Sequence, residues 1–246
     1  MDVIRQQFFD LHVMSDHFDV IMQGFWQTIL LSLIGGGCAL LWGLVLALMR
    51  QLPGRGFAPV RGLGIAYVDV FRGIPFLLVL LLLYTSLGSL ATQGQIPDFI
   101  GHPEFFGKPT NFWIGIYGLT ITYGAYMAEV YRAGLESVPR GQMEAARSLG
   151  MSHGGAMRHV VVPQAVRTVI PPLLNDFIAL MKDTSLLSAI GFVEVVRAGS
   201  DVQSETFNSS GLMLGAILFL LITIPLARIV DRMIAGQQLK IQRAIP

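Results

Sequence analysis

The chain has 246 residues, of which 53% are hydrophobic and only 13% are charged, with a mean hydropathy of +0.60 and a net charge of +1. This apolar, charge-poor composition excludes an ordinary soluble domain and predicts an all-α integral membrane protein. The near-zero net charge gives no support for nucleic acid as a partner, because phosphate binding needs clustered Lys and Arg.

Residues 1–19 are expected to form an arm on the outer side of the membrane. No small-residue cleavage site follows the first apolar stretch, so we do not expect a removable signal peptide. Apolar residues such as Phe8, Phe9 and Leu11 make the arm partly amphipathic. It either rests on the outer interface or forms a loosely ordered terminus, and the sequence leaves both readings open.

Five stretches approach the roughly 20 apolar residues that a helix needs to cross a bilayer. They cover about residues 25–49, 64–90, 112–131, 164–190 and 212–229. An odd number of spans places the two termini on opposite sides. We therefore expect a transmembrane domain over residues 20–232, followed by a short tail over residues 233–246.

The basic residues predict the orientation, because they are retained on the cytoplasmic side. Twelve of them fall on one side of the predicted spans: Arg50, Arg55, Arg61, Arg132, Arg140, Arg147, Arg158, Arg167, Arg228, Arg232, Lys240 and Arg243. The other side holds only Arg5, Lys108 and Arg197, together with most of the acidic residues. The N-terminus is therefore predicted outside, and the C-terminus and the tail inside.

Two features mark the first two spans. Gly35-Gly36-Gly37 in the first span predicts the close approach of another helix. The second span begins with Asp69 and Arg72, which are three residues apart and so lie on one helix face. A lone charge at mid-membrane costs about 2.5–3.5 kcal/mol, so these two form either an interfacial ion pair or part of a transport pathway.

An outer loop over residues 92–111 carries three prolines and several apolar residues, and we expect it to cap the outer mouth or to contact a docking protein. Its glycines and Lys108 superficially suggest a nucleotide-binding loop. However, five residues separate Gly101 from Gly107 where four are required, and Pro109 replaces the needed Ser or Thr. Any ATP hydrolysis must therefore belong to another chain.

A polar, basic island over residues 137–164 follows the third span. The span ends with Glu129 and Arg132, and we expect a salt link between them to hold the root of the island. Pro139 suits a first helical turn, Gly150 provides a stop, and Ser152 can cap a second short helix. The island is therefore predicted to form two short helices joined by a glycine turn, the second ending near Pro163.

The fourth span is the most irregular. Pro171-Pro172 is expected to bend or unwind the helix, and freed backbone groups at membrane depth persist only against protein or a wet cavity. A dense polar set follows: Asn175, Asp176, Lys182, Asp183, Thr184 and Ser185. This density predicts a transport pathway. The alternative is structural, with Lys182 paired to Asp176 or Asp183, and both readings stay open.

The remaining candidates are fewer. Glu194 and Arg197 follow the fourth span on the outer side, where they either pair at helical spacing or meet a zwitterionic solute. The last span opens with a small-xxx-small pattern, Gly211 to Gly215, which permits a close helix contact. The histidines lack the spacing of metal ligands, and no set of nucleophile, base and orienting residue is recognisable. We therefore expect neither a metal site nor an enzyme.

Several of these motifs carry a resemblance to a known family. Glu144-Ala145-Ala146, with Gly150 and Val160-x-Val162-Pro163 after it, resembles the cytoplasmic coupling loop of the membrane-spanning subunits of bacterial ABC importers; valines replace the usual Ile and Leu. The wider run from Tyr126 to Glu194, which includes Lys182-Asp183-Thr184-Ser185, is similar to the polar amino acid uptake branch, and so is Arg72-Gly73-Ile74-Pro75. The resemblance covers roughly residues 20–232.

The resemblance implies a multi-pass permease subunit of the bacterial inner membrane, of the type I importer fold, that moves a polar amino acid by alternating access. Its implied partners are two ATPase subunits, a second permease chain, an extracytoplasmic solute-binding protein, the amino acid and the lipid bilayer. ATP and Mg would be bound by the ATPase, and no cofactor by this chain. The implied coupling residues are Gly141, Glu144, Ala145, Ala146 and Gly150. The polar set of the fourth span would line the pathway, with Asp69, Arg72, Glu194 and Arg197 as further candidates.

Two other functions compete with this reading. A self-sufficient transporter or channel driven by an ion gradient would use the charged residues as ion sites, but the odd span count and the large island argue against it. A membrane scaffold would gain nothing from costly polar groups around Lys182. The sequence does not tell which amino acid is carried, or whether the second permease is identical.

Overall fold

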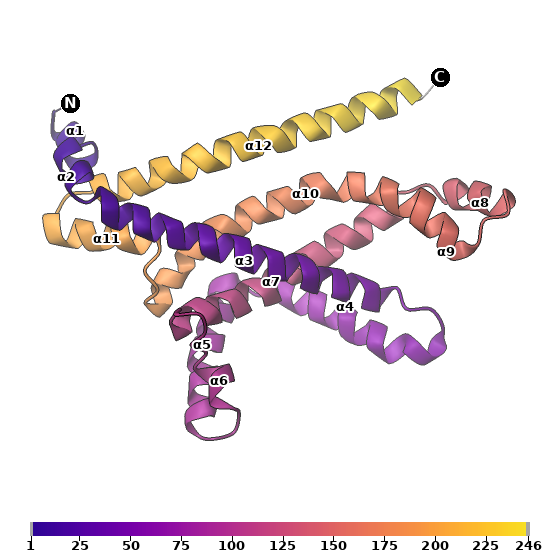
Figure 1. Ribbon diagram of the computed structural model, residues 1–246, viewed down its shortest axis with the longest axis horizontal. Helices are drawn as coiled ribbons and strands as arrows, with labels where there is room; N and C mark the ends of the chain where they lie inside the picture. Colours follow the sequence, from indigo (N-terminus) through magenta and orange to yellow (C-terminus); the bar gives the residue numbers. More distant parts are fainter. Residues whose placement is uncertain (1, 245–246) are drawn as a thin grey trace.

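The structure, a computed structural model, describes residues 2–244, and all the regular elements in this range are helical. Figure 1 shows an elongated arrangement of helices with the two termini at opposite ends. The α-helices are α1 (Asp2–Phe8), α2 (Leu11–Asp16), α3 (Phe18–Arg50), α4 (Ala58–Gly73), α5 (Phe76–Thr92), α6 (Asp98–Gly101), α7 (Thr110–Glu136), α8 (Arg140–Ser148), α9 (His153–Ala156), α10 (Val162–Asp183), α11 (Val195–Thr206) and α12 (Ser210–Ala244). Three short helical segments join them: η1 (Arg55–Phe57), η2 (Met157–Val161) and η3 (Thr184–Ile190).

Helix α7 is the centre of the bundle and packs against α3, α4, α5 and α10. Its contact with α3 is close because small residues face each other there: a Cβ added at Gly43 would lie 2.9 Å from the Gly124 carbonyl oxygen. The predicted role of the triple glycine is confirmed for Gly35 and Gly36, where an added Cβ would meet Leu119 and Phe177, but not for Gly37, which faces open space.

The second predicted span is wrong as a single helix. The chain breaks between α4 and α5, which meet at an angle of 106°. Ile74 at the break is extended, with φ −94° and ψ 132°, because the residue before a proline is disfavoured in helical conformation. In Figure 1, α5 leaves the bundle sharply with α6 beside it. The pair is either a broken span or a re-entrant loop.

Length and composition identify α3 and α12 as helices able to cross a membrane, and the bent pair α4–α5 as a third if it is one span. Helix α7, with 27 residues, has the length but is rich in Gly, Thr and Tyr. A helix covered by its neighbours needs no apolar surface toward lipid. The count of five spans therefore stays a prediction.

The fourth span keeps its helix through both prolines. The expected unwinding is not found, since α10 runs continuously through Pro171 and Pro172 and continues into η3. Pro171 has no N–H to donate to the carbonyl of Arg167, four residues earlier. Instead, the Gln237 side chain of α12 donates a hydrogen bond to that carbonyl. A neighbouring helix thus satisfies the group that the proline frees.

The N-terminal arm is not a loosely ordered terminus. It consists of α1 and α2, which dock on the turn between α11 and α12: the Ser209 N–H donates to the Gln7 carbonyl at 3.0 Å, and the Asp10 N–H donates to Ser210 Oγ at 2.9 Å. Gly211 and Gly215 lie against Val202 and Val195, as the small-xxx-small pattern predicted. These contacts hold the arm, α11 and α12 together at one end of the molecule.

The opposite end gathers the segments that the basic residues place in the cytoplasm. In Figure 1, the α3–α4 connection, the α8–α9 pair and the C-terminus all lie toward the right-hand end, and α1, α2 and α11 lie toward the left. The predicted topology requires this arrangement. The direction of insertion itself, and the domain boundaries at residues 19 and 232, remain predictions; α12 continues through residue 232 without a break.

Candidate functional site

The polar island over residues 137–164 has the two short helices and the glycine turn that the sequence predicts. Helix α8 ends at Ser148, and Gly150 follows two residues later with a left-handed φ of +86°. The Gly150 N–H donates to the Arg147 carbonyl, and the Met151 N–H to the Ala146 carbonyl, which is the hydrogen-bond pattern of a Schellman C-cap. Ser152 then caps α9, its hydroxyl accepting from the Gly155 N–H at 3.1 Å. These local bonds make the turn rigid.

The predicted end of the second helix is wrong. Helix α9 does not stop at Pro163 but passes through the π-helical segment η2 directly into α10, with Pro163 in the first turn of α10. Pro163 has no N–H to donate to the preceding turn, and it stands at the junction where the π-helical segment η2 passes into α10. A displacement of the island is therefore passed along a continuous helical backbone into α10.

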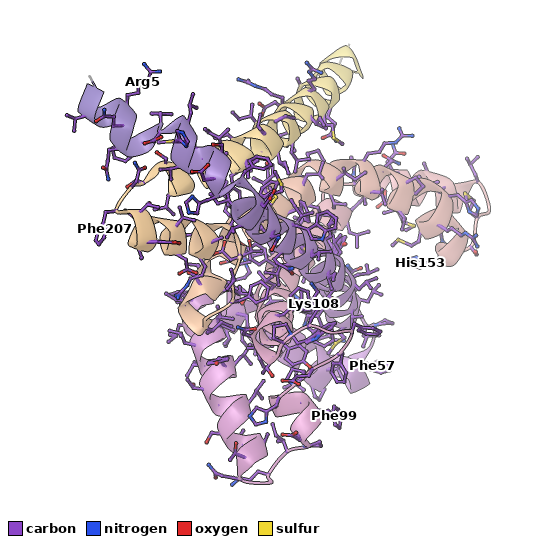
Figure 2. All side chains as sticks on the ribbon, turned by 60° about the vertical axis from the view of Figure 1, so that its left-hand side comes forward. Arg5, Phe57, Phe99, Lys108, His153 and Phe207 are labelled. Atoms are coloured by element: carbon purple, nitrogen blue, oxygen red, sulfur yellow. The ribbon has the colours of Figure 1, made fainter. Side chains whose placement is uncertain are left out.

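The five candidate coupling residues do not share one environment. Gly141, Glu144, Ala145 and Gly150 are exposed, whereas Ala146 is only 4% exposed. A Cβ added at Gly141 or Gly150 would meet no atom within 4 Å. Ala146 thus packs inward, and the other four lie on the outer surface together with Leu149, which is 85% exposed. In Figure 2, His153 marks this island at the tip of the molecule.

A cluster of charges holds the root of the island. Glu129 on α7 accepts from Arg132, as the sequence predicted, and also from Arg50 Nη1 on α3 at 2.9 Å. Arg132 in turn pairs with Glu136. The Arg50 side chain is only 13% exposed, so its partner matters: Glu129 pairs with both arginines and ties the ends of α3 and α7 together.

A second polar cluster lies where α4, α7 and α10 meet. The Tyr123 hydroxyl on α7 donates to Asp183 Oδ2 on α10 at 2.8 Å. The Tyr126 hydroxyl donates to the Arg72 carbonyl, and the Arg72 guanidinium lies 5.9 Å from the centre of the Tyr126 ring. Asp176 lies on α10 two turns before Asp183, and its buried Oδ2 has no hydrogen-bond partner in the described part of the chain.

The structural pairing proposed for the fourth span is wrong. Lys182 is exposed and, among the described residues, makes no salt bridge with Asp176 or Asp183. The Thr184 hydroxyl is buried and donates to the Met181 carbonyl, and the Ser185 hydroxyl donates to the Lys182 carbonyl, each at 2.7 Å. Thr184 and Ser185 therefore bond to their own helix, whereas the exposed Lys182 and Asn175 leave polar groups toward solvent or a partner chain.

The two predicted ion pairs outside that span are also wrong. Asp69 and Arg72 are both exposed, and no salt bridge joins them within residues 2–244. Arg197 pairs with Asp201 at 2.9 Å instead of with Glu194. Spacings of three and of four residues both fit one helix face, and the surrounding fold decides which pair forms.

Glu194 is a buried helix cap. Its two carboxylate oxygens accept from the N–H groups of Val196 and Arg197, each at 2.8 Å, and the residue is 0% exposed. Burial raises the pKa of Glu194 to about 7, and the two N–H donors act in the opposite direction. Glu194 therefore positions the start of α11 and does not face an open path.

The interpretation from sequence missed Tyr123, Tyr126 and Arg50. The two tyrosines stand three residues apart in an apolar stretch, and a hydroxyl at membrane depth is the signal that could have identified them. Arg50 was used only to predict the orientation of the chain in the membrane. Within the described residues, no group of three or more His, Cys, Asp and Glu could hold a metal ion.

Comparison with known proteins identifies the family. Residues 39–236 match the family described as binding-protein-dependent transport system inner membrane component. The chain is 35% identical to the probable glutamine ABC transporter permease protein GlnM of Bacillus subtilis over 89% of this chain and 93% of that protein. It is 32% identical to the glutamate/aspartate import permease protein GltK of Escherichia coli O157:H7, over 79% of this chain and 82% of that one.

Solved structures agree. The fold matches a crystal structure of an amino acid ABC transporter with histidines, with a TM-score of 0.77, 31% identity, and coverage of 90% of this chain and 96% of that chain. An inward-facing structure of the MetNI methionine ABC transporter, 21% identical with a TM-score of 0.65, supports the fold alone. The chain thus belongs to the inner membrane components of binding-protein-dependent transport systems, as a multi-pass amino acid ABC transporter permease subunit.

Proposed function

We propose that this permease moves a polar amino acid across the inner membrane by alternating access, driven by ATP hydrolysis on separate ATPase subunits. The observation that carries the proposal is the α8–α9 island. It projects from the end of the bundle, exposes the α8 surface around Glu144, and continues through η2 into the helix that bears the polar set.

Rigidity suits the island to transmit force. The Schellman turn at Gly150 fixes its tip, and the cluster of Arg50, Glu129 and Arg132 fixes its root. A push delivered to α8 by an ATPase that closes on ATP would reach α10 without being absorbed by a flexible loop. ATP and Mg belong to the ATPase in this proposal, and this chain needs no cofactor of its own.

The pathway lies beside the second polar cluster. An amino acid carries charges that hydrocarbon does not accept, so its path needs compensating groups. The unpartnered Asp176 Oδ2, the Asp183–Tyr123 bond and the Arg72 guanidinium provide both signs of charge at the junction of α4, α7 and α10. One chain leaves part of this set exposed, so a second permease, identical or homologous, completes the enclosure. A solute-binding protein delivers the amino acid to the outer face.

The coupling role is tested by two substitutions that the fold tolerates. Gly141→Trp places a large side chain on α8 where an added Cβ would meet no atom within 4 Å apart from its own stretch of helix. Glu144→Lys reverses an exposed charge. Both should abolish ATP-driven uptake into vesicles that contain the complete transporter, while leaving insertion and thermal stability unchanged. Arg55→Glu, which reverses an exposed charge in the α3–α4 connection outside the island, is the matched control.

Retained ATP-driven uptake in both variants would contradict coupling through α8. Uptake by the wild-type chain without ATPase subunits or ATP would favour the ion-coupled transporter instead, with Asp176 and Asp183 as ion sites. These two results separate a wrong coupling surface from a wrong energy source.

A further inference from the structure

A small polar hollow of about 330 Å³ lies outside the cluster described above. Three segments meet there: α3 near its start, the end of the outer loop, and the connection that follows η3. Its wall includes Gln27, Lys108, Asn111, Phe192 and Val193. The volume is at the lower end of the range for small-molecule sites. Figure 2 shows Lys108 between the α11 end, marked by Phe207, and the α5–α6 projection, marked by Phe99.

Lys108 has unused binding capacity in this hollow. Its Nζ donates to Gln27 Oε1 at 2.9 Å and lies 5.4 Å from the centre of the Phe112 ring. The side chain is partly buried, and no described carboxylate forms a salt bridge with it. An ammonium group has three donors, and the only hydrogen bond found here goes to a neutral amide. A partly desolvated cation of this kind favours an anionic ligand.

Asn111 contributes an unused acceptor. Its Oδ1 is buried and has no hydrogen-bond partner among the described residues. Buried side-chain oxygens are normally satisfied, so a polar hydrogen from outside the chain is expected at this atom. The hollow therefore combines a cation that lacks a carboxylate with an oxygen that lacks a donor.

We propose that the hollow is an outer entry site for the main-chain end of an amino acid. The α-carboxylate binds Lys108 Nζ, and the α-ammonium donates to the free lone pair of Gln27 Oε1 and, once the Asn111 amide turns toward the hollow, to Asn111 Oδ1. The proposal rests on the proposed function for the nature of the solute. Because it uses groups that all amino acids share, the site accepts solutes by their backbone and leaves the selection of side chains to other parts of the transporter.

The test is equilibrium binding to the purified complete transporter in detergent, without the solute-binding protein. Radiolabelled L-glutamine, L-glutamate and L-arginine serve as probes. Lys108→Gln removes the cation and should raise the Kd of the best probe about tenfold, as expected for a lost charge-assisted hydrogen bond. Lys108→Arg keeps the charge and should largely restore binding.

A second variant keeps the lysine. Gln27→Glu places a carboxylate where an amide oxygen now lies 2.9 Å from Nζ, so Lys108 gains an internal partner and the hollow loses its net positive charge. This variant should weaken binding through the solute carboxylate, but by less than Lys108→Gln does, because the new carboxylate also attracts the α-ammonium. Since it adds an ion pair, its folding is not at risk, and elution as a single species confirms this.

Unchanged affinity in Lys108→Gln overturns the entry site. A second result also overturns it: Lys108→Gln binds the amino acid normally, but its uptake falls only when the solute-binding protein is present. Lys108 would then contact that protein and not the solute. Both results leave the proposed function standing if the wild type shows ATP-driven uptake. Absence of ATP-driven uptake refutes the proposed function, and the binding titration still decides the entry site.

Discussion

The two charged clusters on α7 differ in how their charges are compensated. Near the island, Glu129 and Glu136 balance Arg50 and Arg132, and every charge of the cluster has a partner. Two turns earlier, Tyr123 and Tyr126 face Asp183 and Arg72 without forming an ion pair, and Asp176 beside them leaves a buried oxygen unpartnered. A compensated cluster stabilises a fold, whereas an uncompensated one is retained for a ligand.

The largest expected effect is on transport, at Asp176. Asp176→Asn removes a charge whose Oδ2 binds nothing in the described chain, so thermal stability should be unchanged or slightly higher. Uptake into reconstituted vesicles should fall at least about tenfold, the effect of one lost charge-assisted contact with the solute. Tyr131→Phe, which removes a hydroxyl bonded to the Leu40 carbonyl on the same helix bundle, serves as control for uptake.

If Asp176→Asn lost stability but kept normal uptake, Asp176 would be a structural residue, and its cluster would not serve the solute. If uptake and stability both fell in Asp176→Asn, charge compensation would not separate structural residues from ligand-binding ones, and the distinction between the two clusters would be refuted.

The next effect is on stability, at Glu129. Glu129→Gln leaves Arg50, 13% exposed, without its carboxylate and should lower stability by about 1–3 kcal/mol, between the values for exposed and buried pairs. Thermal unfolding in detergent measures this. Glu136→Gln is the matched control, because Glu136 is 64% exposed and pairs only with Arg132, and it should change the midpoint much less. Equal shifts in the two variants would show that the Arg50 contact adds nothing.

The smallest expected effect is the pH dependence of stability at Glu194. This carboxylate is a third kind, because only backbone N–H groups donate to it. Because the pKa of Glu194 is raised from 4.5 to about 7 in the folded chain, the native state holds a proton between these pH values that the unfolded chain releases. Stability should therefore fall as pH rises from about 4.5 to 7 and then level off. The unfolding midpoint of the wild type should drop by a few degrees over this range, relative to Glu194→Gln.

A parallel pH dependence in the wild type and in Glu194→Gln would show that another group causes it. An opposite slope would show that the two N–H donors outweigh burial and that the carboxylate is charged in the folded state.

The sequence by itself determined the local structure and the family. The cap at Ser152, the stop at Gly150 and the Glu129–Arg132 pair were predicted correctly because their partners lie within a few residues. The apolar segments likewise fixed the all-helical membrane class. The long central motif, from the Glu144 region to Lys182, was sufficient for the family because it combines many fixed spacings.

Only the tertiary structure decided which distant groups meet. Arg50 reaches Glu129 across 79 residues, and Tyr123 reaches Asp183 across 60, so neither contact follows from helical spacing. Spacing alone also suggested false pairs, such as Asp69 with Arg72, because an i,i+3 pair is only one of the partners that packing offers. The break at Ile74 was missed because the span was identified by its apolar content, and hydropathy reports burial and not the direction of the chain; Pro75 was the local signal.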